Sequence, residues 1–298
     1  MIKVKIPATS ANLGPGFDSF GLALDWYNEV WLAEADVLKI TAFGHGADRL
    51  PLDETNVVYR ALVRLVQHLG KPMPPVQLRI VNHFPLERGL GSSAAAIVGG
   101  LVAANRFFGD TLTQLELLQL AMELEGHPDN VAPALMGGFT IALTDHSKPI
   151  VLRLTMPPLT VVLVIPDRPL ETKAAREVLP STYAREDVIF NLQRASLLVG
   201  AVATAQLNLL AIAAQDRLHQ PYRAQLLPGM EDALQAGLEQ GAYFTALSGS
   251  GSTLLALCDL KSGPVVAQTM VNRLAQHNVN SQWVETTSSL LGAHIVNP

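Results

Sequence analysis

One stretch of the sequence joins a predicted strand to a predicted helix: Pro85-Leu86-Glu87-Arg88-Gly89-Leu90-Gly91-Ser92-Ser93-Ala94-Ala95. Alternating apolar residues over 76–80 indicate the strand, and the helix is predicted over 92–108. Glycines let backbone approach a ligand, successive amides form an anion-binding concavity, and a helix start adds partial positive charge. This stretch, the phosphate loop, therefore predicts a phosphate site. The alternative is a glycine-rich turn in which Ser92 only caps the helix.

Two further loops rich in glycine and serine favour a ligand site over a simple turn. The N-terminal loop, residues 8–18, follows a strand predicted over residues 2–6 that ends at Pro7. The serine-glycine loop, Ser248-Gly249-Ser250-Gly251-Ser252-Thr253, lies between two predicted strands. Neither loop is as short as a minimal hairpin would be.

The rest of the pattern predicts two domains, residues 1–150 and 151–298. Further elements of the first half are an extended stretch over 22–35, helices over 55–69 and 113–126, and a strand over 139–144. Residues 145–159 carry charges and three prolines, which is typical of a domain junction. The second half gives the order β-α-β-β-α-β, the ferredoxin-like arrangement.

Composition excludes several classes of function. With 21 basic and 26 acidic residues among 298, the net charge of −5 disfavours nucleic acid and anionic membranes as partners. A single cysteine, Cys258, and an N-terminus without an apolar run predict a cytoplasmic protein. The uncharged run over 195–214 is interpreted as a buried helix and not a membrane span, because polar residues interrupt it.

The three loops, in this order, resemble the motifs of the GHMP small-molecule kinases. Two more stretches resemble the homoserine kinases within that family: His127-Pro128-Asp129-Asn130-Val131-Ala132-Pro133 and Thr172-Lys173-Ala174-Ala175-Arg176-Glu177-Val178-Leu179-Pro180. The resemblance extends from Ile6 to about Cys258. One residue departs from the pattern, since Ser252 stands where the family usually has proline.

The resemblance implies an α+β fold of two domains. An N-terminal α/β domain with a left-handed-crossover-type phosphate loop would bind ATP, and the C-terminal domain would be ferredoxin-like. The implied reaction transfers the γ-phosphoryl group of ATP to the hydroxyl of L-homoserine, a step of threonine biosynthesis. Two alternatives stay open: another GHMP kinase, such as one for mevalonate, and a binding protein of this fold without turnover. A homodimer and feedback control are also left open.

L-Homoserine is a zwitterion, so its site must offer a cation, an anion and a polar group near the hydroxyl. By the resemblance, Arg176 and Arg223 bind the carboxylate and Asp18 binds the ammonium. Asn12 and His127 lie near the hydroxyl. The two arginines could instead be a surface charge and a side chain packed on the adjacent tyrosine. The other three could be turn or helix-capping residues.

Phosphoryl transfer asks a protein mainly for positioning and charge stabilisation, so Mg²⁺ is expected with ATP. The resemblance assigns Ser93 and Glu123 to the metal. Glu125 is the weaker choice because it lies about 200° further around the same helix. The remaining histidines show no metal-ligand spacing, so no transition metal is predicted.

Other site residues follow from the same motifs. The phosphate loop would bind the ATP phosphates, Asn56 would lie near the nucleoside, and Gly249, Ser250 and Gly251 would complete the site. Asp129 is the third residue assigned to catalysis, with Ser93 and Glu123. It is either a general base or the anchor of the turn at Asn130, because a loose transition state needs little early deprotonation.

Overall fold

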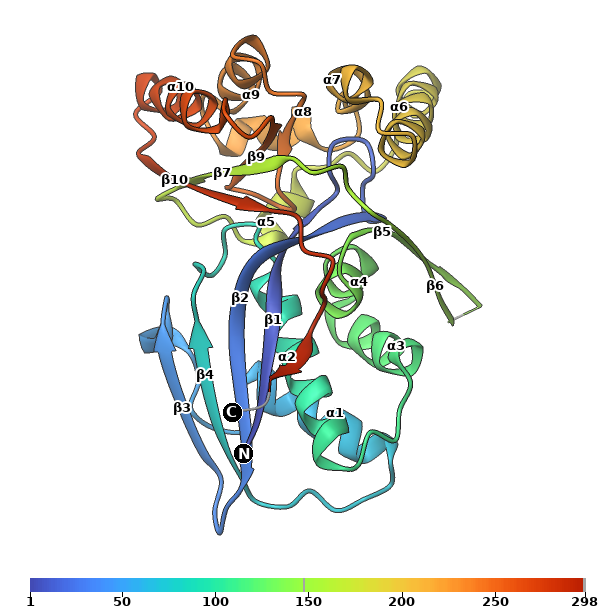
Figure 1. Ribbon diagram of the computed structural model, residues 1–298, viewed down its shortest axis with the longest axis vertical. Coiled ribbons are helices and arrows are strands. Elements are labelled where there is room, and N and C mark those ends of the chain that lie inside the picture. The colour runs from blue at the N-terminus through green and yellow to red at the C-terminus, as the bar shows by residue number, and fades with distance from the viewer. Residues whose placement is uncertain (147, 297–298) are drawn as a thin grey trace.

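The computed structural model describes residues 1–146 and 148–296 and has two domains stacked along its long axis (Figure 1). The N-terminal domain contains a seven-stranded sheet in which β11, β1, β2, β4 and β3 are neighbours and β5 joins β2 to β6. Its strands are β1 (Ile2–Ala11), β2 (Phe20–Glu34), β3 (Lys39–Gly44), β4 (Val76–Asn82), β5 (Phe139–Asp145), β6 (Lys148–Leu154) and β11 (His294–Val296).

Helices cover one face of this sheet (Figure 1). They are η1 (Ala47–Arg49), α1 (Val57–His68), α2 (Ser92–Phe107), α3 (Gln114–Glu125) and α4 (Pro128–Met136). The central helix α2 is buried and rich in small residues, so its neighbours approach closely. A Cβ at Gly100 would lie 2.4 Å from the carbonyl oxygen of Val58 on α1. This packing fixes the start of α2, where the phosphate loop ends.

The C-terminal domain has a four-stranded antiparallel sheet in the order β10-β7-β9-β8. The strands are β7 (Thr160–Pro166), β8 (Phe244–Leu247), β9 (Leu254–Cys258) and β10 (Ser281–Thr287). The helices are α5 (Thr172–Glu177), α6 (Arg185–Ala203), η2 (Leu207–Leu209), α7 (Leu210–Ala213), α8 (Gln220–Arg223), η3 (Ala224–Leu226), α9 (Met230–Glu239) and α10 (Gly263–Gln276). The predicted α+β fold with a ferredoxin-like second domain is confirmed.

The predicted domain boundary at residue 150 is wrong. Strand β6 lies within the supposed junction and pairs with β5, so the first sheet continues to Leu154. The chain then returns at its end, where β11 pairs with β1. Pro149 does not mark a linker, because it lies in the edge strand β6, where proline is tolerated.

Two smaller predictions are also corrected. Strand β1 does not end at Pro7 but continues to Ala11, with its register to β2 shifted at a bulge between Pro7 and Ala8. The uncharged run over 195–214 is not one helix, since α6 ends at Ala203. None of the helices within the described residues is long and apolar enough to span a membrane.

The capping box of α3 provides a test of local stability. The Thr113 hydroxyl accepts a hydrogen bond from the Glu116 amide, and the Glu116 carboxylate accepts one from the Thr113 amide. We expect Thr113→Ala to lower the free energy of unfolding by about 1 kcal/mol. Thr111→Ala is the matched control, because Thr111 is exposed and makes no hydrogen bond among the described residues. Urea unfolding of both variants would measure the difference, and equal losses would contradict the capping role.

Candidate active site

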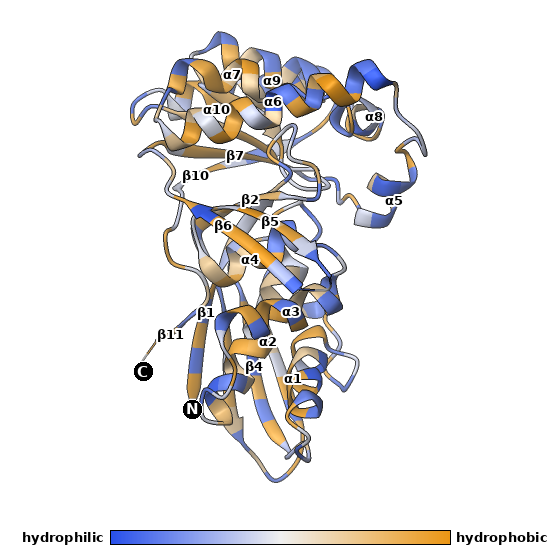
Figure 2. Cartoon of the chain, turned by 90° about the vertical axis from the view of Figure 1, so that its right-hand side faces the viewer, coloured by the Kyte–Doolittle hydropathy of each residue, from blue (hydrophilic) through white to orange (hydrophobic). Residues whose placement is uncertain are grey.

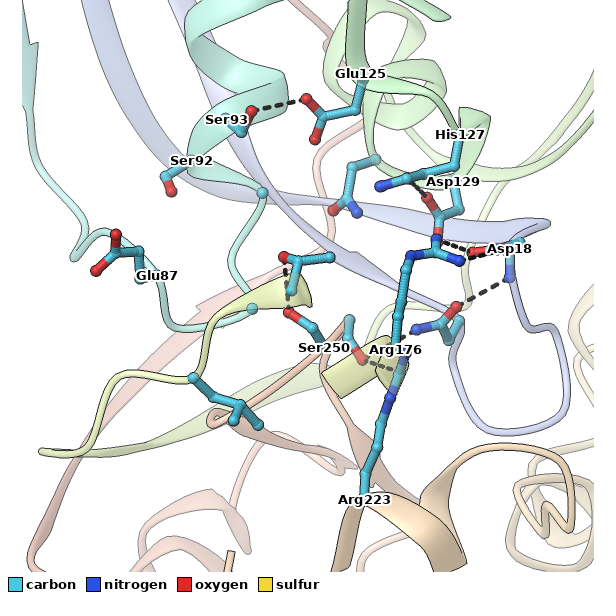
Figure 3. A pocket seen from close by; sticks show the side chains of 17 residues that line it. Asp18, Glu87, Ser92, Ser93, Glu125, His127, Asp129, Arg176, Arg223 and Ser250 are labelled. Atoms are coloured by element: carbon cyan, nitrogen blue, oxygen red, sulfur yellow. Dashed lines mark hydrogen bonds and ion pairs between the residues drawn. The ribbon is translucent and has the colours of Figure 1, made fainter. Parts of the chain in front are cut away.

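A cavity of about 130 Å³ lies between the two domains, and each predicted motif contributes to its wall (Figure 3). Its lining consists of Asn12, Asp18, Glu87, Gly89, Gly91, Ser92, Ser93, Glu125, His127, Asp129, Asn130, Leu170, Thr172, Arg176, Arg223, Gly249 and Ser250. Helix α5, which carries Arg176, stands apart from the other helices of its domain, toward the N-terminal domain (Figure 2). The substrate cavity, as we call it, therefore has walls from both domains.

The phosphate loop forms the concave, glycine-dependent turn that its sequence predicted. Gly89 and Gly91 have positive φ angles of 72° and 68°, and Gly91 is the N-cap of α2. A Cβ at Gly89 would lie 2.1 Å from the carbonyl oxygen of Ser248, so no side chain fits there. Leu90, Ala94 and Ala95 are buried in the core and hold the loop from behind.

Arg88 connects the phosphate loop to the second domain. Its Nε donates to the carbonyl oxygen of Pro166 at 3.0 Å, and Nη2 donates to that of Asp167 at 2.8 Å. Burial, followed by the charge of Arg49, lowers the pKa of its guanidinium. Arg88 does not line the substrate cavity. Through these contacts Arg88 holds the two domains together.

The serine-glycine loop packs directly on the phosphate loop. The Ser248 hydroxyl donates to the carbonyl oxygen of Gly89 at 2.6 Å, and the Thr253 amide donates to that of Arg88 at 3.1 Å. Ser252, where the family usually has proline, donates its hydroxyl to the carbonyl oxygen of Arg168 at 2.6 Å. A hydrogen bond therefore anchors this position of the loop.

A second cavity of about 230 Å³ shares Glu87, Ser92 and Ser93 with the substrate cavity. Its other lining residues are mostly apolar and include Leu86, and Asn56 also contributes. The Asn56 amide is committed to its own chain, because Oδ1 accepts from the Val58 amide at 2.9 Å and Nδ2 donates to the Pro51 carbonyl at 2.7 Å. Asn56 therefore lines this cavity with its amide bonded to its own chain on both sides. The two cavities meet at the start of α2.

Asp18 and Arg176 form an ion pair across the substrate cavity. Nη1 and Nη2 of Arg176 donate to the two carboxylate oxygens of Asp18 at 3.0 and 2.6 Å. These bonds raise the pKa of the guanidinium against the effect of burial. Both side chains are a little over one third exposed, so a ligand can reach them. Arg176 is thus no isolated surface charge.

Arg223 enters the same cavity from α8 and is 2% exposed. Its Nε donates to the carbonyl oxygen of Ala175 and its Nη1 to that of Gly249, both at 3.0 Å. Nη2 makes no hydrogen bond to the described residues. Burial, followed by the charge of Arg176, lowers the pKa of Arg223 to about 10. The guanidinium packs on Phe17, with 5.4 Å to the ring centre, and not on its neighbouring tyrosine.

Asn12 has both a structural contact and a place in the wall. Its Nδ2 donates to the carbonyl oxygen of Gly249 at 3.0 Å, and its Oδ1 accepts from the Asp18 amide at 3.0 Å. The φ angle of 66° is in the left-handed region that asparagine tolerates better than most residues. Asn12 therefore positions Asp18 and the serine-glycine loop.

His127 and Asp129 form a close pair at the start of α4. The distance from His127 Nδ1 to Asp129 Oδ1 is 2.6 Å, and Asp129 is 2% exposed. Burial alone would lower the pKa of His127, but the hydrogen bond and charge of Asp129 outweigh it and raise this pKa. Next to the pair, Asn130 Oδ1 accepts from the Thr9 hydroxyl at 2.8 Å. His127 thus makes a side-chain contact that a helix-capping role did not predict.

The geometry places Glu125, and not the predicted Glu123, beside Ser93 in the substrate cavity. Ser93 donates its hydroxyl to Glu125 at 2.7 Å, and Glu125 lines the substrate cavity (Figure 3). Glu123 pairs instead with Arg64 on α1 at 2.6 Å, outside this cavity. The buried face of α3 carries Leu118 and Ala121, from which position 125 follows at helical spacing. Burial raises the pKa of the Glu125 carboxyl, partly offset by the bond from Ser93.

Leu170 lines the cavity although no predicted motif included it, whereas Thr172 begins the motif of residues 172–180. Leu170 and Thr172 lie on the segment before and at the start of α5, which approaches the phosphate loop through a bond from the Leu170 amide to the Glu87 carbonyl at 3.3 Å. Phe17 contacts both arginines from inside the N-terminal loop. Gly251 and Pro85 belong to predicted loops but do not line the cavity.

Comparisons with known proteins identify the family. The models "GHMP kinases N terminal domain" and "GHMP kinases C terminal" match residues 56–138 and 198–276. A homoserine kinase of Desulfitobacterium hafniense is 46% identical, covering 95% of each chain, and one of Carboxydothermus hydrogenoformans is 45% identical, covering 98% of this chain and 96% of its own. A crystal structure of homoserine kinase from Cytophaga hutchinsonii superposes with a TM-score of 0.90 at 32% identity, over 99% of this chain and 97% of that one. The chain belongs to the GHMP kinase family, among its homoserine kinases.

Proposed function

We propose that this protein is an ATP-dependent homoserine kinase that phosphorylates the side-chain hydroxyl of L-homoserine. The observation that carries the proposal is the junction of two cavities at the start of α2. One cavity is apolar and suits a nucleoside, while the other holds charges of both signs. Between the two cavities, the backbone amides of the glycine-rich phosphate loop suit the phosphates. This order matches a donor nucleotide and a small zwitterionic acceptor that meet at the γ-phosphate.

The charged groups supply one partner for each end of L-homoserine. Arg223 offers the free Nη2 edge and Arg176 a second guanidinium, and two guanidinium groups suit a carboxylate. Asp18 offers a carboxylate to the ammonium. Asp18 and Arg176 neutralise each other in the structure, so L-homoserine would replace this pair with two new ones. Mevalonate has no ammonium and would leave Asp18 without a partner.

The acceptor hydroxyl would then lie near Asp129 and His127. Asp129 Oδ1 is held by His127, while Oδ2 makes no hydrogen bond to the described residues and is available to the hydroxyl. In a loose transition state a carboxylate contributes mainly by orienting the nucleophile and taking its proton late. Asn130, fixed by Thr9, would help to hold the same group. The amides of the phosphate loop would stabilise charge on the transferred phosphoryl group.

Ser93 and Glu125 fit a magnesium site in their chemistry. They present a hydroxyl and a carboxylate oxygen 2.7 Å apart beside the phosphate loop, and Mg²⁺ prefers such oxygen ligands together with substrate phosphates. No group of three or more acidic, histidine or cysteine side chains that could hold a metal ion by itself occurs within 1–146 and 148–296. When bound with ATP, Mg²⁺ would neutralise phosphate charge. Ser93 and Glu125 would supply one or two of its oxygen ligands.

Two finer points belong to the proposal. We expect a cytoplasmic location, because the single Cys258 is a buried free thiol that cannot form an internal disulfide. Association into a homodimer would cover the exposed apolar side chains Val188, Ile189 and Leu192 of α6. Sedimentation velocity would distinguish dimer from monomer.

The substrate assignment is tested by ADP release with L-homoserine, L-serine and mevalonate. We expect turnover with L-homoserine, weak turnover with L-serine because its hydroxyl falls one methylene short, and none with mevalonate. Turnover with mevalonate alone would identify a GHMP kinase that acts on mevalonate. Absence of ADP above background with all three would contradict an enzymatic role.

Arg176→Ala tests carboxylate recognition. We expect the KM for L-homoserine to rise by roughly thirtyfold, or about 2 kcal/mol, while the KM for ATP stays within about twofold. Lys173→Ala on the same helix is the control, since Lys173 is exposed and does not line the cavity. Steady-state kinetics give both constants. A thirtyfold rise in the KM for ATP as well would remove Arg176 from substrate recognition.

Glu125→Gln tests the proposed magnesium site. We expect turnover to fall by at least about tenfold and the activity to need more Mg²⁺, because an amide is a poorer ligand than a carboxylate. Glu123→Gln, two residues away, is expected to stay within about twofold of the unsubstituted protein because its partner Arg64 lies outside the cavity. Activity measured against Mg²⁺ concentration would show the contrast. If Glu123→Gln lost more turnover than Glu125→Gln, Glu123 would be the magnesium ligand instead.

A further inference from the structure

A buried histidine lies behind the substrate cavity, and none of the steps proposed above uses it. His219 is the N-cap residue of α8, with a relative exposure of 0%. Its ring stacks on Phe17 with 5.3 Å between ring centres. Phe17 also contacts the guanidinium groups of Arg176 and Arg223 at 5.7 and 5.4 Å. His219 thus shares a packed cluster with both proposed carboxylate-binding residues.

The partners of His219 determine where its proton lies. Nε2 is 2.7 Å from the carbonyl oxygen of Gly14, which can only accept, so Nε2 carries the hydrogen. Nδ1 is 3.2 Å from Arg223 Nη1, which can only donate, so Nδ1 is an acceptor. Both contacts require the neutral ring with its proton on Nε2. Burial lowers the pKa of His219, which agrees with this state.

The same contacts determine how Arg223 is turned. Nη1 has two hydrogens, and these go to His219 Nδ1 and to the carbonyl oxygen of Gly249. Nε is occupied by the carbonyl oxygen of Ala175. Nη2 therefore remains as the donor edge directed to a ligand. Without the His219 acceptor, one Nη1 hydrogen would lose its partner and the guanidinium could rotate.

A second set of bonds fixes His219 itself. Asp216 accepts hydrogen bonds from the amides of Leu218, His219 and Gln220 at 2.9, 3.0 and 2.7 Å, and from the side chain of Asn191 at 2.7 Å. Four donors hold this buried carboxylate, and it fixes the start of α8. The ring therefore has little freedom to move away from Arg223.

We propose that His219 is a positioning residue for substrate recognition, which fixes the Arg223 guanidinium so that Nη2 faces the carboxylate of the substrate. The inference rests on the proposed function, because it takes that substrate to be L-homoserine. His219 lines neither the substrate cavity nor the second cavity. It acts through Arg223 and joins it to the N-terminal loop at Gly14.

Two substitutions separate the contacts of His219. Asparagine at this position places Oδ1 near Nδ1 and keeps the acceptor for Arg223, whereas glutamine places its amide nitrogen near Nε2 and keeps the donor to Gly14. We expect His219→Gln to raise the KM for L-homoserine about tenfold, the value of one hydrogen bond to a charged group. For His219→Asn we expect less than about a threefold rise, and for both variants a KM for ATP within about twofold.

A double-substitution cycle tests whether the effect passes through Arg223. Lysine has no guanidinium edge to orient, so His219→Gln should add less than about twofold to the KM for L-homoserine when Arg223→Lys is already present. Calorimetric binding of L-homoserine replaces the KM in variants without turnover. Equal effects of the two His219 variants, parallel rises in both KM values, or an undiminished tenfold effect beside Arg223→Lys would overturn the proposal.

Folding is checked by near-ultraviolet circular dichroism. If only His219→Asn folds, a KM for L-homoserine raised tenfold in that variant overturns the proposal, and a value near that of the unsubstituted protein supports it. If neither variant folds, His219 is structural and the proposal fails. Failure of the unsubstituted protein to phosphorylate L-homoserine would instead reject the proposed function, so the two failures are distinguishable.

Discussion

The site depends on three loops, distant in sequence, that hold one another through backbone contacts. The Gly249 amide donates to the carbonyl oxygen of Ala11, and Asn12 donates to that of Gly249. The Ser248 hydroxyl donates to the carbonyl oxygen of Gly89, and the Ser248 carbonyl oxygen leaves no room for a side chain at Gly89. Because these contacts involve main chain and small side chains, they fix the amides of the phosphate loop before any ligand arrives. Amides fixed in advance need no reorganisation to stabilise charge on a phosphoryl group.

This arrangement explains how a chain of net charge −5 can bind an anionic nucleotide. The long-range field repels polyanions, but the phosphate loop uses backbone dipoles that add nothing to the net charge. Within the cavity the signs are divided by domain. Asp18, Glu125 and Asp129 come from the N-terminal domain, whereas Arg176 and Arg223 come from the C-terminal domain. A zwitterion, which carries one charge of each sign, can therefore pair with both domains at once.

Features that depend on neighbouring residues could be predicted from the sequence. The capping box at Thr113, the phosphate loop and the ferredoxin-like strand order each depend on nearby residues or simple periodicity, and the structure has all three. The hairpin of β5 and β6 could not be predicted, because an edge strand with a proline resembles a linker. The choice between Glu123 and Glu125 depended on which face of α3 is buried. The spacing of Leu118 and Ala121 contains that signal, because position 125 continues their face of the helix.

Partnerships across the cavity could not be predicted, because they depend on how the domains sit together. Asp18 and Arg176 are 158 positions apart, yet they form a bidentate pair, which substrate binding would exchange for two others under the proposed function. Such an exchange between partly exposed groups yields less net Coulomb energy than a new ion pair formed alone, because one existing pair is broken. Arg223 differs, since the described residues give it carbonyl oxygens and a neutral histidine as partners but no carboxylate. Under the proposed function, a buried cation that no carboxylate hydrogen-bonds would attract an incoming carboxylate more strongly, so the orientation of Arg223 would influence affinity more than the more visible ion pair.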